Sequence, residues 1–189
     1  MEDVENPILD QISLFSLKAE HTHEFTTSGI PILLKKLETY EEYLEVRPIL
    51  EGVSRCYTVH PREYVEKMLS TPLFYPFIIQ LNTKSNDTFD SSLNGTNDQK
   101  HKKIVAYFEI HVIPHLGRLF DSRLERVIVD PEYRNLGIFS ELLNFTVRFC
   151  TSVLKCNRID LTSENPIAIR MYEKIGFEKV DSNVYRKYL

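Results

Sequence analysis

The segment Val127–Phe139 has the residue types of a phosphate-binding turn. An apolar strand ends at Val129, Asp130-Pro131 stops it because proline cannot continue a central ladder, and a loop then leads into a helix at Gly137. A helix start offers unpaired backbone N–H groups and the positive end of the helix dipole, which together bind phosphate. Gly137 lets the backbone approach a ligand closely, and Arg134 can add a charge-assisted contact. Many strand–loop–helix junctions share these features, so this segment alone indicates an ordinary connection.

A second candidate is Asn165–Phe177, which reads N-P-I-A-I-R-M-Y-E-K-I-G-F. Tyr172 lies near the end of a short predicted helix, where a hydroxyl can project into a cleft. Tyrosine, isoleucine and phenylalanine at helical spacing usually pack in a core. Alone, this segment favours the core role.

Together the two segments resemble the GNAT acetyltransferases. The shared features are R-x-x-G-x-x at Arg134–Phe139, at a strand–helix junction, and N-P-x-A-x-x-x-Y-E-K-x-G-F at Asn165–Phe177. The resemblance covers roughly residues 33–188 without the polar insertion and is strongest over 124–177. It implies an α/β protein with the GNAT acyl-CoA N-acyltransferase fold, a mixed central sheet flanked by helices. It also implies acetyl-CoA as co-substrate and no metal.

The resemblance further implies which residues bind acetyl-CoA. Backbone groups of the strand would pair with the pantetheine arm, and N–H groups of the loop and helix start would hold the pyrophosphate. The implied residues are Val127, Ile128, Val129, Arg134, Asn135, Leu136, Gly137, Ile138, Phe139 and Asn165.

Phe139 is a departure from the family pattern. The family usually has glycine or alanine two positions after the loop glycine, and this chain has phenylalanine. The ring would either crowd the pyrophosphate or point into the sheet.

The implied reaction is direct attack by an amine on the thioester within a ternary complex, which needs no enzyme nucleophile. The N–H group of Val127 would stabilise the oxyanion, and Tyr172 would face the thiolate and act as general acid. Glu125, on the same strand, is the candidate for binding or deprotonating the amine. The alternative for Glu125 is an exposed strand carboxylate without a role.

Within the superfamily, the chain is most similar to the small eukaryotic glucosamine-6-phosphate N-acetyltransferases. The segments that carry this similarity are Leu124–Val129, Pro114–Gly117, Thr58–Pro61 and Tyr185–Tyr188. Those enzymes have an acidic pair where this chain has Glu125-Arg126, so only Glu125 matches. The similarity implies that Arg186 binds the sugar phosphate and that Arg126 assists. It also implies a homodimer that exchanges its last strand, so that Arg186 acts in the partner's site.

Two other functions remain open from the sequence. One is a GNAT enzyme that acetylates another small amine, a polyamine or a protein N-terminus, which acidic residues around Glu125 would favour. The other is a non-catalytic GNAT module that binds CoA or a partner protein, which Phe139 would favour.

The elements that position these residues follow from hydrophobic periodicity and turn signals. The expected strands are Pro31–Leu37, Phe77–Leu81, Ile104–Ile113, Arg118–Val129, Arg158–Leu161, Phe177–Val180 and Asn183–Tyr188. A first helix is expected directly after Thr39. Further helices are expected over Pro61–Ser70, Gly137–Lys155 and Pro166–Ile175. The helix that starts at Gly137 has so broad an apolar stripe that it must lie on the sheet.

Two parts of the chain are expected to lie outside this sheet. Residues 1–30 are acidic and lack a clean hydrophobic period, which predicts an N-terminal extension before a domain at 31–189. Residues 82–103 are polar and nearly free of apolar side chains, so they cannot offset their ordering entropy. We therefore expect a disordered insertion there.

Composition narrows the partners. The 189 residues carry a net charge of -4, which does not suggest nucleic-acid binding. The sequence has no apolar run of membrane-spanning length, and its acidic start lacks the pattern of a secretory signal. We expect a cytoplasmic enzyme whose substrate is a small-molecule amine. The three cysteines do not form a metal-ligand pattern, and we expect His111 and His115 to be structural.

Overall fold

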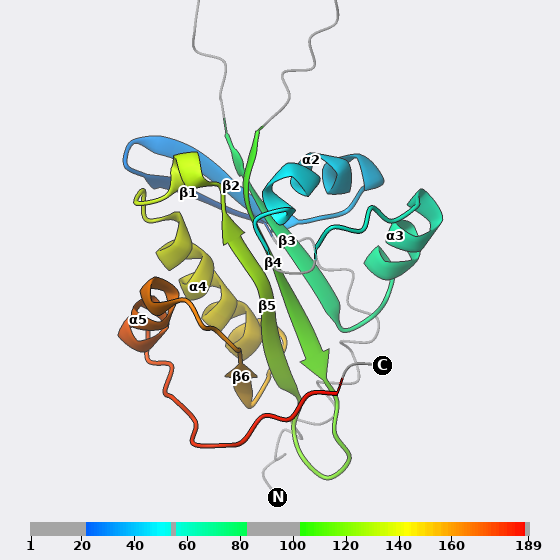
Figure 1. The fold of residues 1–189 in the computed structure, drawn as a ribbon, viewed down its shortest axis with the longest axis vertical. Coiled ribbons are helices and arrows are strands. Elements are labelled where there is room, and N and C mark those ends of the chain that lie inside the picture. Colours follow the sequence, from blue (N-terminus) through cyan, green and yellow to red (C-terminus); the bar gives the residue numbers. More distant parts are fainter. Residues whose placement is uncertain (1–21, 54–55, 83–102, 188–189) are drawn as a thin grey trace, which may run out of the picture.

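The computed structural model describes residues 22–53, 56–82 and 103–187. These residues form a six-stranded sheet with helices on both faces (Figure 1). The strands are β1 (Thr22–Thr27), β2 (Ile30–Lys36), β3 (Phe74–Leu81), β4 (Ile104–Ile113), β5 (Asp121–Val129) and β6 (Arg158–Asp160). The helices are α2 (Tyr40–Leu50), α3 (Arg62–Leu69), α4 (Ile138–Arg148) and α5 (Pro166–Lys174). The short turn η1 (Pro131–Tyr133) precedes α4, and η2 (Phe149–Val153) extends it.

The strands lie in the sheet in chain order, from β1 to β6. Neighbours from β1 to β5 are antiparallel, whereas β6 runs parallel to β5. A parallel neighbour requires a crossover connection, and α4 supplies it. The predicted mixed sheet flanked by helices is therefore confirmed.

Helix α4 packs on one face of the sheet and forms the larger core. Its apolar stripe of Ile138, Leu142, Phe145 and Phe149 is buried, as the periodicity predicted. The ring of Phe77 on β3 meets Phe145 edge-on, with centroids 5.0 Å apart. The position of α4 is therefore fixed by aromatic packing against the central strands.

Helix α2 packs on the opposite face. Thr39 and Glu42 form a capping box at its start, which satisfies two backbone donors. Its buried residues Val46 and Leu50 join Tyr107 of β4 and Ile128 of β5 in a second core. Strands β4 and β5 are therefore held between the two helical layers.

Strand β1 lies inside the range expected to be an N-terminal extension. It pairs with β2 from Thr22 opposite Lys35 to Thr27 opposite Ile30. Its alternate residues His23, Phe25 and Thr27 are half-buried, so the sheet begins before residue 31. Residues 1–21, and residues 83–102 of the expected insertion, lie outside the described residues.

The prediction of two strands at the end of the sequence is wrong for the described residues. Residues 177–187 form no strand, although Phe177–Val180 and Asn183–Tyr188 were predicted to do so; Tyr188 itself lies outside the described residues. The side chains of Val180, Val184 and Tyr185 are 71%, 75% and 89% exposed. Strand preference depends on packing against a neighbour, and no described residue covers these side chains.

Within the described residues, no helix combines the length and apolar character needed to cross a bilayer.

Candidate functional site

Strand β5 contains a bulge in its middle. Tyr107 of β4 stands opposite Ile128, but Glu109 stands opposite Glu125, so β5 has one extra residue between these pairs. Arg126 lies there with a left-handed φ of 56°. A bulge interrupts the ladder and leaves backbone groups unpaired, which allows the predicted oxyanion contact at the neighbouring Val127. This bulge could not be predicted from residue types, because arginine is not a residue that marks left-handed backbone.

The other edge of β5 is open beside the bulge. Strand β6 pairs with β5 only from Asp121 to Arg123, and no strand of the described chain pairs with β5 beyond that point. Figure 1 shows the short β6 beside the first part of β5. The backbone of Val127–Val129 on this edge can therefore bond to an extended ligand.

The loop after β5 leads directly from this edge to the start of α4. Arg134, Asn135 and Gly137 are exposed, whereas Ile138 is buried. Asn135 and Gly137 have φ values of 63° and 84°, and no side chain caps the helix start. The first-turn N–H groups of α4 therefore have the arrangement that binds a phosphate.

Strand β1 contacts this loop through Thr27. The Thr27 hydroxyl donates a hydrogen bond to the carbonyl of Leu136. A Cβ on Gly137 would lie 2.8 Å from the Thr27 Oγ1 atom. This contact leaves no room for a side chain at position 137. It is not predictable without β1, which the sequence did not indicate.

Basic residues fix the outer side of the loop. The Nε atom of Arg134 donates to the carbonyl of Val129 at 3.1 Å, so part of its guanidinium holds the turn together. The ammonium of Lys103 lies 3.3 Å from Asp130 and 2.9 Å from Glu132. The loop is thus anchored on both sides while its backbone stays exposed.

Tyr172 lies in α5 against the helix start. Its side chain is buried, and its ring centroid is 5.6 Å from that of Phe139 and 5.7 Å from that of Phe177. Burial raises the pKa of Tyr172 to about 12, so the phenol stays protonated near neutral pH and can donate a proton. Phe139 packs on the core and on Tyr172, which agrees with the alternative that its ring points inward.

Asn165 is the N-cap of α5. Its Oδ1 atom accepts from the N–H groups of Ile167 at 2.9 Å and Ala168 at 3.4 Å. The cap uses the oxygen of the side-chain amide. The Nδ2 atom of Asn165 is therefore the side-chain atom left for the predicted contact with the cofactor.

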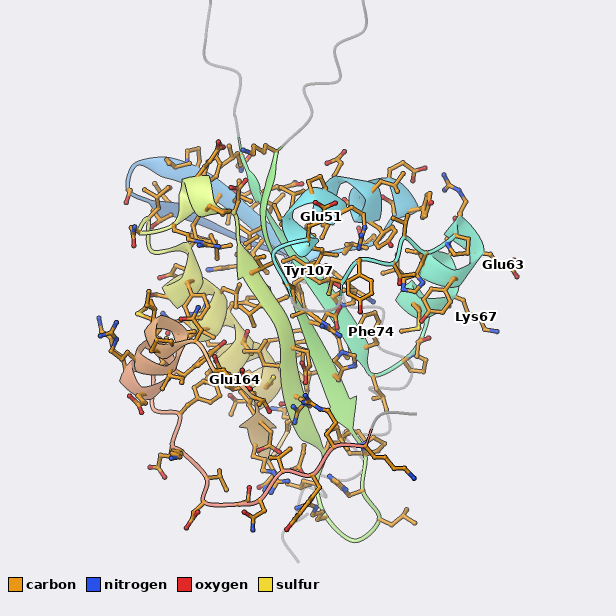
Figure 2. The ribbon with its side chains drawn as sticks, viewed as in Figure 1. Glu51, Glu63, Lys67, Phe74, Tyr107 and Glu164 are labelled. Atoms are coloured by element: carbon orange, nitrogen blue, oxygen red, sulfur yellow. The ribbon has the colours of Figure 1, made fainter. Side chains whose placement is uncertain are left out.

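Glu125 belongs to a row of polar side chains on the face of the sheet that also packs against α2. Glu109 is its partner across the strands, and His111 is the partner of Arg123. Arg123 Nε donates to Glu125 Oε1. Figure 2 shows Tyr107 of β4 just below the end of α2, and Phe74 of β3 farther down the sheet. Neither Glu109 nor His111 is among the predicted site residues, although the alternation Tyr107-x-Glu109-x-His111 places the three side chains on one face.

The two arginines predicted to bind a sugar phosphate lie in different places. Arg126 is in the bulge near Tyr107. Burial raises the pKa of Tyr107, and the charge of Arg126 opposes this rise in small part. Arg186 lies in the exposed segment 178–187, and it makes no hydrogen bond or ion pair with any described residue. The structure therefore does not bring Arg186 to Glu125 within one chain. The described residues also contain no group of three side chains suited to a metal ion.

The model of a known family, described as "Acetyltransferase (GNAT) family", matches residues 53–177. The L-amino acid N-acetyltransferase AaaT of Escherichia coli K12 is 33% identical over 86 residues, which span 41% of this chain and 53% of AaaT. The match thus spans about half the length of that relative.

Solved structures share the fold at low identity. An acetyltransferase of Trypanosoma brucei superposes with a TM-score of 0.65 at 17% identity, covering 83% of this chain and 99% of that one. Glucosamine-6-phosphate N-acetyltransferase of Arabidopsis thaliana gives 0.64 at 16% identity, covering 83% and 98%. Likeness at this identity concerns the backbone arrangement alone.

Proposed function

Because this chain belongs to the acetyltransferase (GNAT) family, we propose that it transfers the acetyl group of acetyl-CoA to the amine of a small molecule. The observation that carries this proposal is the continuity between the open edge of β5 and the uncapped start of α4. A ligand with an extended arm and a diphosphate matches both features in the order in which they occur.

The donor site consists mainly of backbone. The edge groups of Val127 and Val129 bond to the pantetheine arm, and the N–H groups from Arg134 to Phe139 hold the pyrophosphate. Arg134 and the Asn165 side-chain nitrogen add polar contacts. Acetyl-CoA supplies the thioester, and the N–H group of Val127 stabilises the negative charge that develops on its carbonyl oxygen.

The chemical step uses two side chains from opposite sides of β5. Glu125 holds the ammonium group of the acceptor, and Tyr172 donates a proton to the leaving sulfur. Such a positioned proton donor typically contributes ~10²–10⁴-fold to the rate. Burial of Tyr172 supports this role because its raised pKa keeps the proton available.

For the acceptor, our leading candidate is glucosamine-6-phosphate. The segments quoted above support it, and the Arabidopsis enzyme shares the fold. A sugar phosphate needs a cationic partner, and Arg126 beside Glu125 supplies one. The exposed apolar side chains of Val180, Val184 and Tyr185 support a homodimer in which this segment packs on a second copy and Arg186 binds the phosphate there.

A second candidate acceptor is an α-amino acid. Glu125 is paired with Arg123 and adjoins Arg126, and an amino acid needs one carboxylate for its ammonium and one cation for its carboxylate. The partial similarity to AaaT favours the same class.

Release of CoA thiol by the full chain tests the function and separates the candidates. Acetyl-CoA is offered with glucosamine-6-phosphate, with glucosamine, with L-amino acids or with a polyamine. A strong preference for the phosphorylated sugar over glucosamine supports the leading candidate. Preference for amino acids supports the second, and CoA binding without turnover of any amine supports a non-catalytic module.

A further inference from the structure

We propose that His111, oriented by Glu109, accepts the proton that the acceptor amine must lose before it attacks the thioester. This inference rests on the proposed function, since it assigns the base of that reaction. A typical amine is present as its ammonium form near neutral pH. A base is therefore required on the side of β5 where the amine substrate binds.

His111 lies on the face where Glu125 is found. It stands opposite Arg123, one pair along from Glu109 and Glu125. The residues just after α2 cover the neighbouring Tyr107, which is buried. The side chains of Glu109 and His111 are 19% and 39% exposed, and that of Glu125 is 37% exposed. This part of the face is thus accessible to a small molecule.

Glu109 determines which nitrogen of His111 carries the hydrogen. An ionised carboxylate only accepts hydrogen bonds. Its Oε1 atom accepts from the Tyr107 hydroxyl at 2.8 Å, and its Oε2 atom lies 3.0 Å from Nε2 of His111. Nε2 must therefore donate, and in the neutral ring Nδ1 carries the free lone pair. No other described residue forms a hydrogen bond with the imidazole ring of His111.

The other side of the ring is also held. Phe74 of β3 lies with its ring centroid 4.9 Å from that of His111. Among the described strands, the charged neighbours of His111 are Glu109 on its own strand and Arg123 and Glu125 on β5, while β3 contributes the uncharged Phe74. The ring is therefore fixed in place by one carboxylate and one aromatic contact.

Glu125 is better suited to bind the amine than to take its proton. Its Oε1 atom already accepts from Arg123 Nε, and Arg123 also donates to the Thr162 hydroxyl at 2.9 Å. This chain of contacts ties Glu125 to the connection before α5. A carboxylate paired with a cation retains an oxygen that can hold an ammonium group, which positions the substrate.

The protons balance as follows. One ammonium proton passes to Nδ1 of His111 and then to solvent. It passes through a bridging water, because Glu125, which holds the amine, and His111 are diagonal neighbours on adjacent strands, a spacing of ~7–8 Å. The amine nitrogen forms a bond to the carbonyl carbon, and the carbon–sulfur bond breaks. The sulfur takes the proton of Tyr172, and the second proton of the nitrogen restores the phenol.

Replacement of His111 tests this assignment in the active full chain. In His111→Gln we expect kcat near neutral pH to fall by ~10²-fold or more, with unchanged CoA affinity by calorimetry. The loss should shrink as pH rises, because the free amine then forms without a base. A purely structural defect would not change the pH profile. His23→Gln, on the distant edge strand β1, is the control and should keep the wild-type profile.

Two further measurements guard against misfolding. Added imidazole should restore part of the rate of His111→Ala and leave the rate of His23→Ala unchanged. In the wild type, nitrogen chemical shifts should show His111 with its proton on Nε2, and Glu109→Gln should weaken that preference. This NMR result needs no substrate, so it is independent of the proposed function.

Several results would overturn the inference. One is an active wild type together with a His111→Gln variant that has the same rate and the same pH profile. Another is an NMR result that places the proton of the neutral His111 ring on Nδ1. Absence of turnover in the wild type with every amine would instead reject the proposed function.

Discussion

At the scale of single residues, Tyr172 has the two properties of an effective proton donor. It is buried against Phe139 and Phe177, which restricts its ring. Burial also raises the pKa of its phenol to about 12. The phenylalanine at 139, which departs from the family pattern, thus helps to hold the tyrosine in place.

Tyr172→Phe should lower kcat by ~10²-fold while leaving the affinity for CoA nearly unchanged, because it removes a proton and keeps the ring packing. Steady-state kinetics with acetyl-CoA and the preferred amine measure this. A variant with wild-type kcat would exclude Tyr172 as the general acid.

Gly137→Ala should weaken CoA binding and lower the melting temperature. Left-handed backbone costs an L-residue about 1–2 kcal/mol, and the new Cβ would lie 2.8 Å from Thr27 Oγ1. Calorimetry and thermal unfolding should show that Thr27→Ala added to Gly137→Ala recovers part of the loss. Strictly additive effects of the two substitutions would contradict the contact.

At the scale of elements, the proposed function depends on the bulge in β5 and on its short pairing with β6. The helix α4 and the strand Ile104–Ile113 were predicted correctly, since a broad apolar stripe and a continuous apolar run are strong local signals. The loop at Arg134–Gly137 was also located, because turn residues mark it. The bulge, β1 and the unpaired C-terminal segment depend on contacts between distant parts of the chain. Local propensity therefore could not predict them.

Arg126→Val and Arg126→Asn form a matched pair for testing the bulge. Both remove the charge, but asparagine tolerates left-handed backbone and a β-branched valine does not. We expect kcat of the valine variant to be lower by ~10-fold, which corresponds to about 1.4 kcal/mol, because the neighbouring N–H groups move. Equal kinetics of the two variants would show that the bulge geometry is not needed.

At the scale of the whole molecule, the sheet separates a donor side from an acceptor side. The uncapped start of α4 and Tyr172 lie on one side of β5, and Glu125, Glu109 and His111 lie on the other. In the proposed reaction, the two sides meet at the bulge, where the strand is interrupted.

The buried tyrosines also predict how the stability of the whole molecule depends on pH. The folded-state pKa of Tyr172 is raised from 10.0 to about 12 by burial, and that of Tyr107 is raised for the same main reason. A raised pKa gives a stabilising contribution that is complete below the unfolded value and is lost as pH rises through the folded value. Chemical denaturation at about pH 8 and about pH 11 should show a smaller free energy of unfolding at the higher pH, with a smaller decrease in Tyr172→Phe. An equal decrease in both proteins would contradict this assignment.

The most direct test of the account is a crystal structure of the full chain with CoA. We expect the pyrophosphate to accept hydrogen bonds from the backbone N–H groups at the start of α4, and the sulfur to lie beside the hydroxyl of Tyr172. A CoA molecule bound elsewhere, with the ring of Phe139 filling the space in front of those N–H groups, would contradict it.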